Sequence, residues 1–186
     1  SHDEVFSLAD YLSVRADGRF AYRPTVMFVY HPCDDAMLSA LELEGGGWIM
    51  QPSRRRLGAD IVEGMDELGV LLAGHEKNAY WYGSQLTIAD ARSHVPYANA
   101  TTMQVTAGAI AAVMWAIKNP RRGLVEPENL DYEECLATAA PYLGRLIGEF
   151  TDWTPLDGRG RYFPEKLDVQ SPWQLQNIRS RQWHGE

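Results

Sequence analysis

Runs of apolar residues, separated by turn-forming residues, predict several strands along the chain. The run Thr-Val-Met-Phe-Val-Tyr at 25–30 is apolar at both alternating positions, which predicts a strand covered on both faces. Shorter runs bounded by Pro, Gly and charged residues are typical of antiparallel strands. They lie at 48–50, 57–62, 68–73, 79–82 and 146–150. The pair at 68–73 and 79–82 is expected to form a hairpin through the loop 74–78.

Capping residues predict two helices in the first part of the chain. Ser7, with Asp10 three residues later, predicts a short helix over 7–14. Asp34 or Asp35 is expected to cap a second helix, which ends at the glycines 45–47.

Two further helices are predicted beyond residue 100. Thr101 or Thr102 is expected to cap the longest helix, which ends before Pro120. Small residues on one side and large apolar residues elsewhere predict that this helix is buried on most sides. Asp131 and Glu134 form a capping box before a further helix.

The order of these elements predicts an α/β (α+β) fold, with a mixed, mostly antiparallel sheet and helices packed on it. Residues 1–24 are predicted to be a connecting segment that contains a short helix. Residues 25–151 are predicted to form the α+β domain. Residues 152–186 form an aromatic tail, broken by prolines, without regular periodicity. It is expected to lie across a surface that this chain does not fully supply. Its aromatic residues are Trp153, Tyr162, Phe163, Trp173 and Trp183.

Composition and charge narrow the class of protein. The 186 residues are 45% apolar and 23% charged, which is typical of a globular protein. A net charge of −8 without a basic stripe argues against nucleic acid as a partner and suits a cationic ligand. The longest apolar run, 107–117, is shorter than the roughly 18 residues of a membrane span, so a soluble protein is predicted. The start at Ser1, without a signal peptide, suggests a segment of a longer protein.

Spacing alone identifies no site. His31, Cys33 and Asp34 are too close together to ligate one tetrahedral metal, and no metal site is predicted. Cys33 has no evident general base. Neither glycine-rich stretch is predicted to lie between the end of a strand and the start of a helix. The sequence therefore has no dinucleotide-binding fingerprint. The basic run at 54–56 fits either an anion site or a solvated turn.

Several ordered motifs resemble one known family. They are Tyr-Arg-Pro-Thr-Val at 22–26, Tyr-His-Pro-Cys-Asp at 30–34, Asp-Glu-Leu-Gly-Val-Leu-Leu at 66–72, Asn-Ala-Thr-Thr at 99–102 with Gln-Val at 104–105, and Asp-Trp-Thr-Pro-Leu at 152–156. Together they resemble the C-terminal part of bacterial homospermidine synthases, which belong to the saccharopine dehydrogenase/reductase-like superfamily. The resemblance covers roughly residues 1–157, and the tail matches less distinctly.

The resemblance implies a cytoplasmic, homodimeric enzyme that makes homospermidine from putrescine by NAD-dependent aminobutyl transfer. Its steps are oxidation to an imine, amine exchange and reduction. NAD is then bound mainly by an N-terminal Rossmann domain that this chain lacks. Residues 25–151 correspond to the substrate-binding and dimerisation domain, and residues 152–186 pack on the NAD domain.

The resemblance also implies site residues. His2 matches a substrate-pocket histidine that relays a proton, and Asp66 matches an acidic residue that contacts the diamine; a register one residue away makes it Glu67. No residue of this chain is assigned to NAD, and the isolated chain is expected to have negligible activity. A carboxyspermidine- or saccharopine-type dehydrogenase, with Arg54, Arg55 and Arg56 facing its pocket, and a noncatalytic dimerisation domain are the alternatives.

Overall fold

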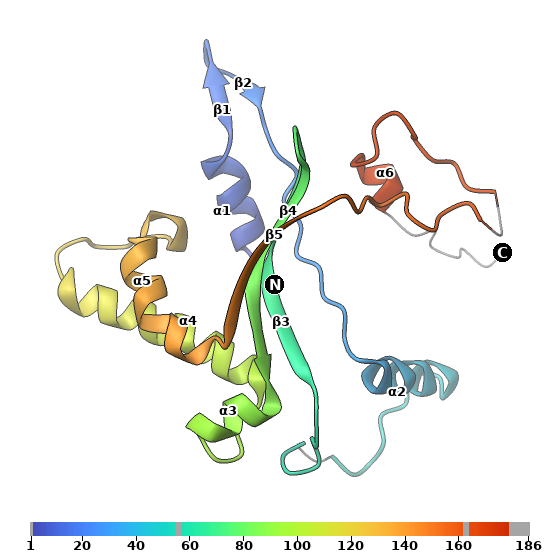
Figure 1. Cartoon of the computed structure of the whole chain (residues 1–186), viewed down its shortest axis with the longest axis vertical. Coiled ribbons are helices and arrows are strands. Elements are labelled where there is room, and N and C mark those ends of the chain that lie inside the picture. Colours follow the sequence, from blue (N-terminus) through green and yellow to red (C-terminus); the bar gives the residue numbers. More distant parts are fainter. Residues whose placement is uncertain (1, 55–56, 162–163, 179–186) are drawn as a thin grey trace. The chain divides into compact units, whose positions relative to one another are not determined.

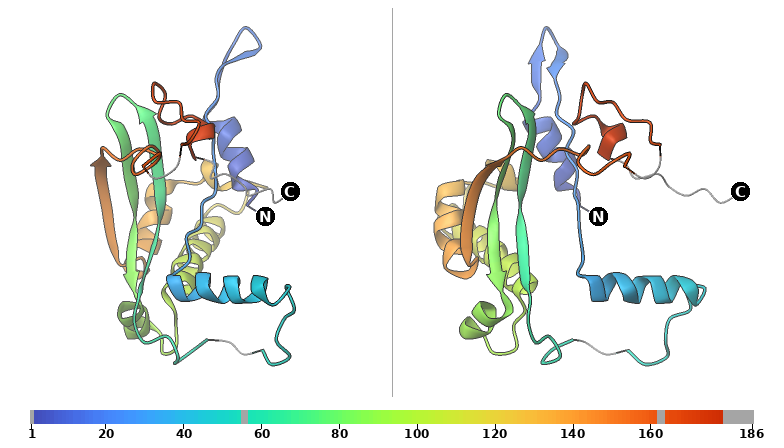
Figure 2. Two further views of the ribbon diagram at one scale, coloured as in Figure 1. Left: turned by 90° about the vertical axis from the view of Figure 1, so that its right-hand side faces the viewer. Right: turned by 45° about the vertical axis from the view of Figure 1, so that its right-hand side comes forward.

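A computed structural model describes residues 2–54, 57–161 and 164–178, which fall into two compact units (Figures 1 and 2). The first unit consists of residues 1–58 and 111–136, and the second of residues 59–110 and 137–186.

The second unit is built on a three-stranded antiparallel sheet in the order β3-β4-β5 (Figure 1). Its strands are β3 (Met65–His75), β4 (Asn78–Thr87) and β5 (Arg145–Thr151). They contain the predicted strands at 68–73, 79–82 and 146–150, which are confirmed. The hairpin is tighter than predicted, because His75 pairs with Asn78 and leaves a two-residue turn.

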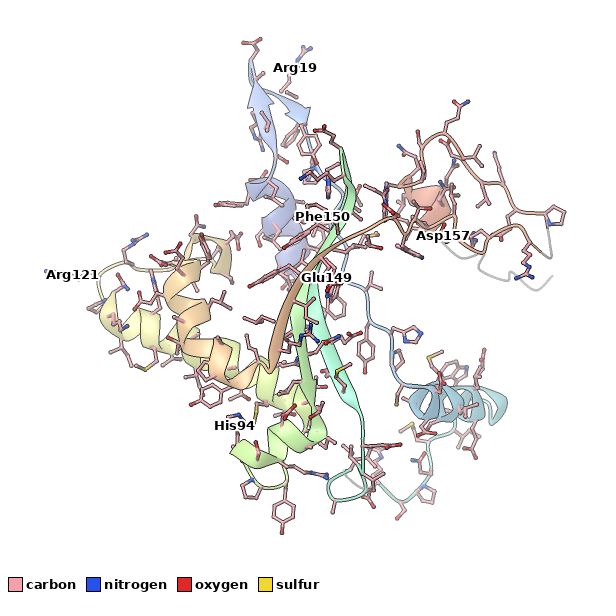
Figure 3. The ribbon with its side chains drawn as sticks, in the orientation of Figure 1. Arg19, His94, Arg121, Glu149, Phe150 and Asp157 are labelled. Atoms are coloured by element: carbon pink, nitrogen blue, oxygen red, sulfur yellow. The ribbon has the colours of Figure 1, made fainter. Side chains whose placement is uncertain are left out.

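An aromatic ring covers one face of this sheet at its centre. Gly69 on β3 pairs directly with Gly83 on β4. A Cβ atom at Gly69 would lie 2.6 Å from the indole of Trp81, and one at Gly83 would lie 2.9 Å from it. The absence of side chains at this glycine pair therefore lets the Trp81 indole lie against the backbone of both strands. At the far end, the Phe150 ring of β5 contacts Tyr80, with 4.8 Å between the ring centroids (Figure 3).

Helices α3 (Ile88–His94) and α4 (Ala100–Lys118) follow β4. Helix α3 was not predicted; Thr87 caps it by accepting a 3.0 Å hydrogen bond from the Asp90 backbone N–H. The cap of α4 is Asn99, whose Oδ1 accepts from the Thr102 N–H at 2.7 Å, so the prediction of Thr101 or Thr102 is wrong. A small core joins the sheet to these helices: Leu86, Ala91, Ala100 and Met103.

Helix α4 is buried along one stripe only, which corrects the prediction that it is buried on most sides. The stripe has helical spacing and consists of Ala100, Met103, Gln104, Ala107, Ala111 and Trp115. Val105 and Ile117 on the other faces are 62% and 67% exposed. Within the described residues, α4 is the one helix long and apolar enough to cross a membrane by length and composition, a test that core helices of soluble proteins also pass.

The first unit carries helices and one small hairpin (Figure 2). Helix α1 (Glu4–Tyr11) precedes the antiparallel strands β1 (Val14–Ala16) and β2 (Arg19–Tyr22), and α2 (Asp34–Gly45) follows. The chain returns with the 3₁₀ turn η1 (Pro127–Asn129) and helix α5 (Tyr132–Ala139), which runs into the second unit. Asp131 Oδ1 accepts from the Glu134 N–H at 3.0 Å, as the capping box predicts.

Two local predictions in this unit are wrong, and one hairpin was not predicted. Helix α1 begins at Glu4, before Ser7, whose hydroxyl donates back to the Glu4 carbonyl instead of capping. Cys33, not an aspartate, is the N-cap of α2, although the helix stops at the predicted glycines. The β1–β2 hairpin was not predicted, although its turn, Asp17-Gly18, has positive φ at both residues, as hairpin turns favour.

The predicted buried strand at 25–30 does not form. These residues are outside any strand, and Val29 and Tyr30 are 76% and 72% exposed. β-branched and aromatic residues favour extended backbone, but a strand also needs a partner for its N–H and C=O groups, and no described strand pairs with this segment. The predicted strands at 48–50 and 57–62 are likewise absent.

The described part of the tail has a polar core of its own. Beyond the 3₁₀ turn η2 (Ala140–Tyr142) and β5, it contains the short helix α6 (Leu175–Ile178). The fully buried Asn177 amide donates to the carbonyl groups of Asp168, Ser171 and Pro172. The Trp173 indole N–H donates to Asn78 Oδ1 at 3.0 Å, which holds the tail against the β3–β4 hairpin. Tyr162, Phe163 and Trp183 lie outside the described residues.

Candidate functional site

His2 lies just before α1, in a cluster with an acidic and an aromatic residue. Its Nδ1 is 2.7 Å from Glu4 Oε1, and its ring stacks on Phe28, with 3.5 Å between centroids and 10° between planes. An ionised carboxylate only accepts hydrogen bonds, so Nδ1 carries the proton. The other ring nitrogen, Nε2, is then the one that can take up a proton from a neighbouring group.

Glu4 was not predicted as a site residue, although it stands in the same Ser-His-Asp-Glu stretch. A hydrogen bond with its own backbone N–H and one with His2 lower the pKa of the Glu4 carboxyl. Glu4 therefore stays ionised as the partner that fixes the orientation of the His2 ring. The i to i+2 spacing at a helix start was the available signal.

Asp66 and Glu67, at the beginning of β3, project to opposite faces of the sheet. Asp66 pairs with the buried Leu86, so its side chain lies on the face that α4 covers, and the residue is half-buried. Glu67 is exposed, pairs with Gln85, and accepts a hydrogen bond from the Gln85 amide. Only one of the two carboxylates can therefore face a given pocket.

A polar group from α4 supports the strand at Asp66. The Gln104 amide Nε2 donates to Ser84 Oγ at 2.8 Å and to the backbone carbonyl of Asp66 at 3.4 Å. Ser84 Oγ in turn donates to the Leu68 carbonyl at 3.4 Å. In the sequence, Gln104 is part of a family motif but was not predicted as a site residue; the available signal was a single amide among apolar residues at helical spacing.

The predicted site residues fall into both units. His2, with Glu4 and Phe28, belongs to the first unit, while Asp66 and Glu67 belong to the second. Each group is thus built by its own unit, the histidine at a helix start and the carboxylates at a strand start.

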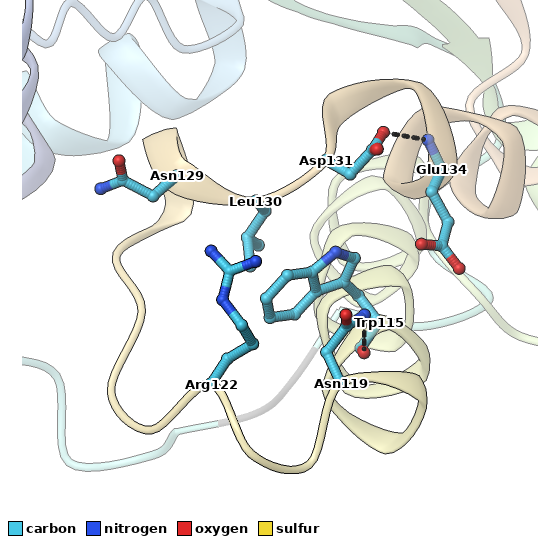
Figure 4. Close-up of a pocket in the computed structure, with 7 residues that line it drawn as sticks. All are labelled: Trp115, Asn119, Arg122, Asn129, Leu130, Asp131 and Glu134. Carbon is cyan, nitrogen blue, oxygen red and sulfur yellow. Dashed lines mark hydrogen bonds between the residues drawn. The ribbon is translucent and has the colours of Figure 1, made fainter.

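A pocket of roughly 330 Å³ lies in the first unit and contains none of the predicted site residues (Figure 4). Most of its polar groups have structural roles. Asp131 caps α5, Glu134 pairs with Lys118, and the Arg122 guanidinium lies 5.6 Å from the Trp115 ring centroid. The residues that line the pocket are Trp115, Asn119, Arg122, Asn129, Leu130, Asp131 and Glu134.

The remaining candidate groups add no site. Within 2–54, 57–161 and 164–178, no three His, Cys, Asp or Glu side chains are grouped to hold a metal. Cys33 is an exposed free thiol, and burial raises the pKa of the Cys135 thiol. Arg54 is exposed, while Arg55 and Arg56 lie outside the described residues.

Comparison with known proteins defines the relationship. The saccharopine dehydrogenase C-terminal domain family matches residues 1–152. The chain belongs to this family. Homospermidine synthases of Mesorhizobium japonicum and Blastochloris viridis are 52% and 50% identical to it, each over 96% of the chain.

The solved structures give the same relationship for this saccharopine dehydrogenase C-terminal domain. The homospermidine synthase of Legionella pneumophila, in complex with NAD, superposes with a TM-score of 0.91 and 46% identity over 97% of the chain. The chain spans 37% and 38% of the two curated relatives and 39% of the solved chain. The match to the Mesorhizobium japonicum relative covers 180 residues and so extends beyond the expected range of roughly 1–157.

Proposed function

We propose that this chain is the C-terminal part of a homospermidine synthase, which transfers an aminobutyl group from one putrescine to another with release of ammonia. The identity to two curated homospermidine synthases over nearly the whole chain carries this proposal. The net charge of −8 agrees with a dicationic substrate.

NAD is the proposed cofactor. It would accept hydride in the oxidation step and return hydride in the reduction step. The described strands pair only antiparallel, and among the described residues no glycine-rich loop leads directly from a strand into a helix. These residues do not fit a dinucleotide site, so we propose that NAD is bound mainly by an N-terminal domain outside this chain, as the family resemblance implies.

The residues of this chain are proposed to bind the diamine and to move a proton. The half-buried Asp66 carboxylate would bind the remote ammonium group, an interaction that strengthens where water is partly excluded. The attacking amine must lose a proton before it can form a bond to carbon, and His2 Nε2 would accept it. Glu4, hydrogen-bonded to Nδ1, would hold the imidazole in the required tautomer.

Assembly and location belong to the same proposal. We expect a cytoplasmic homodimer, in which residues 25–151 bind substrate and contact the second copy and residues 152–186 pack on the NAD domain. The exposed apolar residues of α4 support this proposal, because they could be covered by the second copy or by the NAD domain.

The test compares the chain alone with the chain fused behind the N-terminal part of the Mesorhizobium japonicum relative, here called the joined protein. Incubated with putrescine and NAD, the joined protein is expected to form homospermidine, and the 186-residue chain none above background. Chromatography of the polyamines measures both. A joined protein that folds and binds NAD but acts only on carboxylated diamines or amino acids would instead favour a carboxyspermidine- or saccharopine-type dehydrogenase. Lack of polyamine binding would favour a noncatalytic domain.

A matched pair of substitutions tests the assignment of Asp66. Asp66→Asn in the joined protein is expected to raise KM for putrescine by about 10- to 100-fold, since it removes a charge-assisted hydrogen bond. Glu67→Gln, one residue away on the opposite face, is expected to change KM by less than about threefold. Steady-state kinetics measures both. The reverse ranking would assign the ammonium to Glu67.

A further inference from the structure

We propose that Gln104 is a positioning residue that fixes the beginning of β3, and with it the Asp66 carboxylate, for substrate binding. The inference rests on the proposed function, because it assigns Gln104 a role through Asp66. Gln104 lies on α4, remote in sequence from Asp66, and the affinity for the diamine would depend on it.

Gln104 is a polar residue in a stripe built otherwise of apolar side chains. It is 2% exposed, and its neighbours along the stripe include Met103 and Ala107. A buried amide is costly to desolvate, so it persists where its hydrogen bonds have a use. Its two hydrogen bonds run to the sheet, one to Ser84 Oγ and one to the Asp66 carbonyl.

The Asp66 carbonyl determines the orientation of the amide. A carbonyl oxygen only accepts, so the Gln104 atom facing it must be the Nε2 donor. The opposite orientation would place two oxygens against each other. Nε2 therefore bridges the main chain of β3 and the side chain of β4, from the face on which Asp66 also projects.

This orientation leaves the other end of the amide unsatisfied. Gln104 Oε1 is buried and has no hydrogen-bond donor among the residues that the structure describes. A side chain selected only for packing would avoid a buried acceptor without a donor, since methionine has nearly the same shape and no such group. Burying Oε1 without a donor costs free energy of folding. This cost indicates that the two hydrogen bonds made by Nε2 have a use beyond packing.

The test is Gln104→Met in the joined protein. We expect KM for putrescine to rise about three- to tenfold, because this is the size of effect that the loss of a neutral hydrogen bond produces. We expect kcat to change by less than about twofold. The thermal midpoint of the 186-residue variant is expected to be equal to or above that of the parent, because the unsatisfied oxygen is gone. Met103→Leu, a volume-conserving change at the adjacent buried position, is the control and should leave KM unchanged.

A double substitution shows whether Gln104 acts through Asp66. Once Asp66→Asn has removed the charge, adding Gln104→Met should raise KM by less than twofold more. Full additivity of the two effects, or an unchanged KM for Gln104→Met alone, would overturn the inference while Asp66→Asn still supports the proposed function. A joined protein that folds and binds NAD but forms no homospermidine would refute the proposed function itself, whereas an Asp66→Asn variant without effect would refute only the assignment of Asp66.

Discussion

Replacing His2 by asparagine is expected to lower kcat of the joined protein by about 100-fold or more. The asparagine amide can still donate to Glu4, as Nδ1 does at 2.7 Å, but it has no ring nitrogen that can accept a proton in place of Nε2. General acid–base catalysis by one side chain contributes about 100- to 10,000-fold, which sets the size of the loss. Steady-state kinetics with putrescine measures it, and KM should change much less than kcat.

Two variants make this result interpretable. Glu4→Gln should cause a smaller loss, because a neutral amide still holds the ring but fixes its tautomer less well. His75→Asn is the matched control: His75 also uses Nδ1 in a hydrogen bond, from the Lys77 N–H at 3.1 Å, but lies at the tip of the β3–β4 hairpin. If His2→Asn keeps more than half of the parental kcat, His2 does not transfer the proton.

Replacing Gly144 by alanine is expected to destabilise the chain by about 3 kcal/mol or more. Gly144 precedes β5 with φ of +69°, and a Cβ atom there would lie 2.2 Å from the backbone oxygen of Gln85. Backbone atoms of a paired strand cannot rotate away, so β5 must shift away from β4. Because Arg145 pairs with Gln85, the displacement begins at the first register pair of β5.

Urea unfolding of the 186-residue chain measures this loss as a lower midpoint. Gly158→Ala is the control that separates the backbone angle from the clash. Gly158 has φ of +73° in the same unit, with nothing within 4 Å of the added Cβ, so it should lose only about 1–2 kcal/mol. Equal losses at the two positions would show that the close approach of β5 to Gln85 contributes nothing.

Local patterns predicted the elements whose signals lie within a few residues. The capping box at Asp131, the glycines that end α2 and the apolar runs of β3, β4 and β5 needed no information from distant segments. The segment 25–30 has strong strand composition but forms no strand, because pairing is decided by which segments become neighbours.

The sequence by itself determined the family, through motifs whose order and spacing are specific, and it supplied the hypothesis that His2 and Asp66 act on the diamine. Only the tertiary structure decided that Asp66 and Glu67 face opposite sides of β3, that Glu4 holds the His2 ring, and that Gln104 supports the strand at Asp66. The physical reason is that a side chain's partners depend on strand register and helix packing. Both bring together residues far apart in the chain, as Gln104 and Asp66 are, and no local pattern records them.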